Sequence, residues 1–137
     1  SAGMADYIED LAAHHGITGD AVTRAAGVHD LMRAHETALL QPLLDFLKDR
    51  NSARLIGPVE AGQKAPTVAV ALNRPGAEAA AQLAQHGIMA GGGDFYAVRP
   101  LTAMGVDPER GVLRLSFVHY TTSAEVDKLL TALDDIL

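Results

Sequence analysis

The 137 residues are the usual length of one domain, and 48% of them are apolar, enough for a single core, although only 4% are aromatic. The net charge of -6 comes from 17 acidic and 11 basic residues without a Lys/Arg-rich run, which excludes the electrostatic signature of a nucleic-acid or anionic-membrane partner. The absence of cysteine excludes disulfides, thiolate metal sites and a cysteine nucleophile.

Two helices are predicted in the first third of the chain. Apolar residues recur at helical spacing from Met4 to His15, and Gly16 is a natural helix stop. Residues 17–27 form a mixed connector punctuated by glycine. A second apolar stripe over residues 28–50 then predicts a long helix.

The apolar period then shortens from the helical value to two, which indicates strands. Extended chain is predicted at 54–58, 67–72, 88–98 and 112–118, helices at 75–86 and beyond 122, and a short helix before the last strand. This order predicts an α+β fold: a small, mainly antiparallel sheet with helices packed on one face, preceded by a long lead-in helix. In the last strand, alternation places Leu113, Leu115 and Phe117 on the core face and Arg114 on the other.

The start of the final helix carries a capping box, Thr122-Ser-Ala-Glu125, in which the threonine and the glutamate satisfy each other's backbone amides. Tyr120, just before it, is expected to pack against the final helix. His29 and His35 lie six residues apart, which does not place them on one helix face, so we predict no metal site.

No stretch approaches the roughly 20 apolar residues of a membrane span, and no basic region followed by an apolar one opens the sequence. We therefore expect no membrane partner. The lack of cysteine fits a reducing compartment, and we predict a cytoplasmic location.

The second half of the chain contains two motifs, GIMAGGGDFYAVRPL at 87–101 and GVLRLSFVHYTTSAEVDKLLTAL at 111–133. Their order resembles the end of class V aminotransferases and cysteine desulfurase-like proteins. Upstream, RLIGP at 54–58, PTVAVAL at 66–72 and the opening helix resemble the same family's small domain and its lead-in. The resemblance covers nearly all of the chain but only about the last third of a typical family member.

The resemblance implies a domain division. It predicts that residues 1–27 are a helix and connector from the end of a preceding large domain, and that residues 28–137 are the carboxy-terminal small domain. The large domain would be a missing partner that binds pyridoxal 5'-phosphate through a lysine. Lys48, Lys64 and Lys128 stand in no such context, so we expect no cofactor on this chain. Loss of a partner surface also predicts a homo-oligomer.

Arg114 is the main candidate for chemistry, as a substrate-binding residue. A guanidinium in mid-strand needs a partner, and its forked donors fit a carboxylate. The sequence spacing alone favours a structural ion pair with an acidic residue. The resemblance instead implies that this arginine binds the α-carboxylate of an amino-acid substrate.

The glycine-containing stretch 91–96 corresponds to the loop where desulfurases of this family carry their catalytic cysteine, which this sequence lacks. We expect a loop near the parent's active site, with Gly92, Gly93, Asp94, Tyr96 and Arg99 as candidate residues. No catalytic residue is assigned.

We therefore predict a carboxy-terminal fragment of a pyridoxal-phosphate enzyme, inactive by itself. The alternative is a free-standing α/β module for binding or self-association. A coding sequence that continues upstream into a cofactor domain would support the enzyme fragment over the free-standing module.

Overall fold

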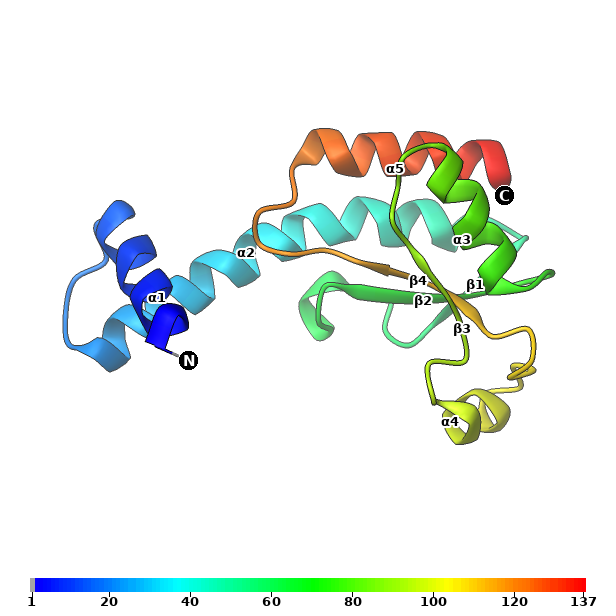
Figure 1. Cartoon of the computed structure of the whole chain (residues 1–137), viewed down its shortest axis with the longest axis horizontal. Helices are drawn as coiled ribbons and strands as arrows, with labels where there is room; N and C mark the ends of the chain where they lie inside the picture. Colours follow the sequence, from blue (N-terminus) through cyan, green and yellow to red (C-terminus); the bar gives the residue numbers. More distant parts are fainter. Residues whose placement is uncertain (1) are drawn as a thin grey trace.

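A four-stranded antiparallel sheet with the strand order β1-β2-β4-β3 organises the computed structural model, which describes residues 2–137. Helices α2, α3 and α5 cover one face of the sheet, while the short α4 lies on the other side (Figure 1). The predicted α+β fold class is confirmed. The elements are α1 Ala2–His14, α2 Ala21–Lys48, β1 Ala53–Ile56, the 3-10 turn η1 Ala61–Gln63, β2 Thr67–Leu72, α3 Gly76–Gln85, β3 Gly91–Gly93, α4 Val98–Ala103, β4 Val112–Ser116 and α5 Ser123–Ile136.

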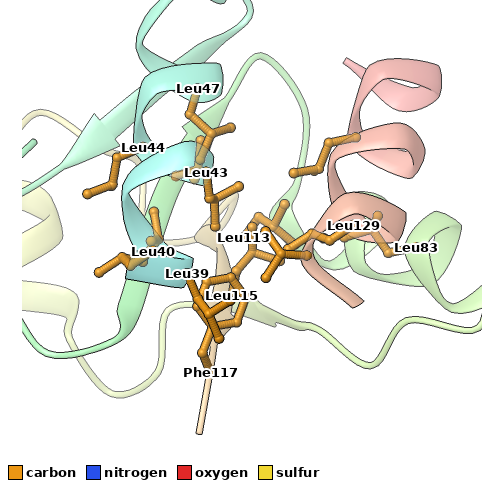
Figure 2. Packing of buried hydrophobic residues seen from close by; sticks show 14 of the residues in the cluster. Leu39, Leu40, Leu43, Leu44, Leu47, Leu83, Leu113, Leu115, Phe117 and Leu129 are labelled. Atoms are coloured by element: carbon orange, nitrogen blue, oxygen red, sulfur yellow. The ribbon is translucent and has the colours of Figure 1, made fainter. Parts of the chain in front are cut away.

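The main core lies between the sheet and its three helices. Alternation along the strands turns Val68 and Val70 of β2 and Leu113 and Leu115 of β4 toward the helices, where they are buried. Leucines from the second half of α2 pack against these residues. Leu83 of α3 and Leu129 of α5 belong to the same cluster (Figure 2). The predicted core face of β4 is therefore confirmed, including Phe117 just beyond it.

Helix α2 begins at Ala21, well before the apolar stripe that predicted it. Asp20 caps the helix, because its carboxylate accepts a hydrogen bond from the amide of Thr23 at 2.8 Å. The early turns pack against α1, and Arg24 pairs with Glu9 across the two helices at 2.6 Å. The predicted division between residues 27 and 28 therefore falls inside one continuous helix, which projects from the sheet together with α1 (Figure 1).

The glycine-containing stretch forms less strand than predicted. Extended chain was expected over 88–98, but only Gly91–Gly93 pairs with β4. Phe95 and Tyr96 have positive φ angles of 50° and 59°, which turn the chain out of the sheet before α4 begins.

The capping box at the start of α5 is confirmed. The Thr122 hydroxyl accepts from the Glu125 amide at 3.2 Å, and the Glu125 carboxylate accepts from the Thr122 amide at 2.8 Å. These bonds from Thr122 hold the pKa of Glu125 below its ordinary value. Tyr120 contradicts the prediction that it packs on this helix: it is 72% exposed, with its ring edge-on to His119.

Replacing Thr122 with alanine is expected to lower the free energy of unfolding by about 1 kcal/mol, because one amide in the first turn of α5 loses its acceptor. Thr131→Ala is the matched control, since Thr131 bonds only the Asp127 carbonyl one turn earlier and alanine is a good helix former. Urea unfolding at neutral pH measures both variants. Equal losses in the two would contradict a capping role.

The same box predicts a pH dependence. Because folding lowers the Glu125 pKa from 4.5, its stabilising contribution is present above that pH and is lost as the pH falls through the lower folded value. Glu125→Gln keeps a capping side chain that does not titrate. The wild type should melt at a higher temperature than this variant at pH 5. The difference between the two melting temperatures should decrease as the pH is lowered below 5.

Candidate functional site

The open face of the sheet carries Arg114 at the centre of β4. Leu113 and Leu115 point into the core, so Arg114 and Ser116 point out and are exposed. The residues opposite Arg114 on the neighbouring strands are Ala69 of β2 and Gly91 of β3. Both are small, which leaves the space around the guanidinium open.

Arg114 stacks on an aromatic ring instead of pairing with an acid. Its guanidinium carbon lies 4.1 Å from the centroid of the Phe95 ring. Among residues 2–137, no carboxylate forms an ion pair with it. The structural ion pair that the spacing favoured is therefore not formed, and Arg114 remains exposed on the open side of the sheet.

The turn after β3 brings Phe95 to Arg114. The Asp94 carboxylate accepts a hydrogen bond from the Tyr96 amide at 3.2 Å, and the Asp94 carbonyl accepts one from the Ala97 amide at 2.8 Å. These bonds close the turn around the two residues with positive φ. Tyr96, at its tip, is wholly exposed.

A small second cluster of apolar residues supports this turn on the open side of the sheet. Leu101 of α4, Val106 and Val112 form its buried part, and Phe95 and Ala97 pack against it. The cluster explains why Val112 is buried although it lies on the same face of β4 as Arg114. Phe95 therefore contacts both this cluster and the Arg114 guanidinium.

The other predicted loop residues lie in different surroundings. Gly92 belongs to β3 and approaches the start of α3, on the core side of the sheet. Gly93 ends β3 and lies against Gly111. Arg99 is exposed on α4. The structure thus brings Asp94 and Tyr96 to the turn beside Arg114, whereas Gly92 contacts a helix.

Phe95 was not among the candidate residues chosen from the sequence. One signal pointed to it: an aromatic residue placed directly after three glycines and an aspartate, in a chain with few aromatic residues. Its proximity to Arg114 depends on the left-handed turn, which alternation and composition do not reveal.

The lysines do not form a pyridoxal-phosphate site beside Arg114. Lys48 and Lys128 are exposed on their helices. Lys64 lines a cavity of about 510 Å³ between α2 and η1, where burial lowers its pKa and its amine lies 3.5 Å from the Pro58 carbonyl. The lining of that cavity includes neither Arg114 nor Phe95, so a group bound there would not share their site.

Between residues 2 and 137, no group of three or more histidine, cysteine, aspartate or glutamate side chains is placed to hold a metal ion. None of the helices in this part of the chain combines the length and apolar character needed to cross a membrane.

The fold and the site together define a two-layer α+β domain that presents an arginine, free of acidic partners among the described residues, on the open face of its sheet. The family model described as aminotransferase class-V matches residues 21–129. The chain therefore belongs to the class-V aminotransferase family, which depends on pyridoxal phosphate. No curated protein sequence matches it.

Three solved structures share the fold. The apo cysteine desulfurase of Thermococcus onnurineus NA1 matches with a TM-score of 0.70 and 22% identity, over 85% of this chain and 30% of its own. The cysteine desulfurase CsdA of Escherichia coli matches with a TM-score of 0.64 and 24% identity, over 84% of this chain and 29% of its own. A NifS-like protein matches with a TM-score of 0.64 and 28% identity, over 85% of this chain and 31% of its own. This chain thus spans less than a third of each.

Proposed function

We propose that this chain is the carboxy-terminal small domain of a pyridoxal-phosphate enzyme that acts on an amino acid, and that Arg114 binds the substrate's α-carboxylate. The observation that carries the proposal is the state of Arg114: it is exposed on the open face of the sheet, stacked on Phe95, and paired with no acid among residues 2–137.

A guanidinium in this state is suited to an anionic ligand. Its planar fork can donate two parallel hydrogen bonds to a carboxylate, and such charge-assisted bonds are about twice as strong as neutral ones. An arginine that served only the fold would be expected to bond to an acid or a carbonyl, as Arg24 does to Glu9. Small neighbours on both adjoining strands leave room for the ligand.

The cofactor and the catalytic groups would come from the remainder of the parent protein. None of the three lysines lies at the Arg114 site, so we assign the cofactor lysine to a preceding large domain and expect this chain to be inactive alone. Because there is no cysteine, desulfuration through a cysteine persulfide on this chain is excluded. A transamination or lyase reaction of the parent is therefore the better hypothesis.

The projecting helices support a partner surface. Met4, Tyr7, Val22 and Leu31 are between 39% and 79% exposed on α1 and the first half of α2. We propose that the large domain covers part of this surface and that the parent is a homo-oligomer. The alternative, a self-associating module without catalysis, uses the same exposed residues.

The test is a titration of the 137-residue chain with L-alanine, followed by NMR of the arginine side chains. We expect the Arg114 Nε–H signal to shift with L-alanine but not with L-alaninamide, which lacks the carboxylate. Arg114→Gln and Arg114→Lys lack this signal, so their binding is followed through the backbone amide signals of β4. Arg114→Gln should weaken binding about tenfold or more, because it removes a charge-assisted contact. The affinity of Arg114→Lys for L-alanine should lie between those of the wild type and Arg114→Gln, since lysine keeps the charge but lacks the forked donors.

Arg110→Gln is the matched control, because Arg110 is also exposed and does not belong to the turn beside Arg114. It should bind L-alanine like the wild type. If Arg114→Gln also binds L-alanine with unchanged affinity, the assignment of the carboxylate site is wrong.

A further inference from the structure

We propose that Phe95 is a positioning residue for Arg114: its ring fixes the guanidinium plane so that the hydrogen-bonding edge is held ready for a carboxylate. The inference rests on the proposed function of Arg114. It assigns a role to the turn that carries Phe95.

The first observation is the contact itself. The guanidinium carbon lies 4.1 Å from the ring centroid, within the range of a cation–π interaction. An arginine side chain is otherwise free to sample many rotamers, and binding a carboxylate would have to select one of them. Stacking restricts this freedom before the ligand arrives, which lowers the entropic cost of binding.

The second observation is that the surroundings of Phe95 place its ring there. The ring packs against Leu101 and its neighbours in the second cluster. Gly91, the residue opposite Arg114 on β3, provides the space: a Cβ atom at Gly91 would lie 2.9 Å from Cζ of Phe95. Glycine at this position therefore lets the ring approach the guanidinium.

The third observation is the backbone. Phe95 and Tyr96 both have positive φ angles, which bulky residues rarely adopt. Such conformations persist where the surroundings over-determine them, and they concentrate at ligand-binding turns. Here the bonds of Asp94 and the second cluster hold the turn, and its result is to fold the Phe95 ring back onto the sheet.

The test compares Phe95→Leu, Phe95→Tyr and Phe46→Leu in the same L-alanine titration. Phe95→Leu keeps an apolar side chain for the second cluster but removes the aromatic face, whereas Phe95→Tyr keeps it. Phe46→Leu is the matched control. It removes a second arginine–aromatic stack, in which the Arg50 guanidinium lies 4.4 Å from the ring of Phe46 on α2.

Phe95→Leu should weaken L-alanine binding about two- to fivefold, the size expected for one exposed cation–π contact. The Arg114 Cδ protons should also lose the upfield shift caused by the ring. Phe95→Tyr should keep the wild-type L-alanine affinity and the wild-type Cδ proton shift, and Phe46→Leu should change neither. Gly91→Ala displaces the ring without removing it and should reproduce the effect of Phe95→Leu.

The outcomes separate the two proposals. If wild-type Arg114 responds to L-alanine but Phe95→Leu and Gly91→Ala retain the wild-type affinity, the positioning role is wrong and the carboxylate site stands. If the wild-type Arg114 signal does not respond to L-alanine, both proposals are wrong. An affinity loss in Phe46→Leu equal to that in Phe95→Leu would also overturn the positioning role, because the effect would not be local to Arg114.

Discussion

Replacing Leu43 with alanine is expected to lower the free energy of unfolding by about 3 kcal/mol, within the range of about 2–5 for a buried leucine. Leu43 is fully buried on α2, where it lies in the leucine cluster that faces the sheet (Figure 2). Alanine has the highest helix propensity, so the helix itself is not weakened. The loss therefore measures packing between α2 and the sheet.

Leu31→Ala is the matched control, since it makes the same change in the same helix at a side chain that is 39% exposed. It should cost less than about 1 kcal/mol, because little apolar area returns to water. Urea unfolding of both variants gives the comparison. If Leu31→Ala cost as much as Leu43→Ala, the loss could not be assigned to packing between α2 and the sheet, because Leu31 is partly exposed.

Several elements could be predicted from the sequence because their signals are local. Alternation of β-branched and small residues predicted β2 with its observed bounds, and alternation in β4 correctly separated the core residues from Arg114. The Thr122–Glu125 spacing predicted the start of α5. In each case the physical cause, a two-residue period or a hydrogen bond within one turn, lies within a few residues.

The prediction of α2 shows where such signals stop. An apolar stripe reports which part of a helix is buried on the sheet, and it does not report where the helix begins. The first turns of α2 pack on α1 with small apolar residues and no leucine or aromatic residue, so the stripe missed them. Asp20 followed by Thr23 was the available signal, since aspartate is a preferred N-cap.

The site was predicted only in part for a similar reason. The position of Arg114 on the open face follows from the strand period alone. Its stacking on Phe95 requires the left-handed turn at 95–96, the missing side chain of Gly91 and the second cluster around Leu101. That cluster also includes Val106 and Val112, and Arg114 lies on β4, so no local pattern contains the whole arrangement.

A second large loss of stability is expected in β3. Gly92→Ala should lower the free energy of unfolding by about 3 kcal/mol, at the upper end of the range for side chains added to a well-packed core. A Cβ atom at Gly92 would lie far inside van der Waals contact with the backbone of Gly76 and Ala77, at the start of α3. Backbone atoms cannot rotate away as a side chain does. Either α3 or β3 must move, and β3 carries Gly91 beside Arg114.

Gly62→Ala is the matched control for this prediction, because a Cβ atom at Gly62 meets no atom within 4 Å. It should leave stability within about 0.5 kcal/mol of the wild type. Thermal unfolding measures stability, and the L-alanine titration measures the site in the same samples at low temperature. Gly92→Ala should lose both stability and Arg114 affinity, since the strand that it displaces holds the turn of Phe95. Wild-type stability in Gly92→Ala would show that α3 does not pack directly on this strand.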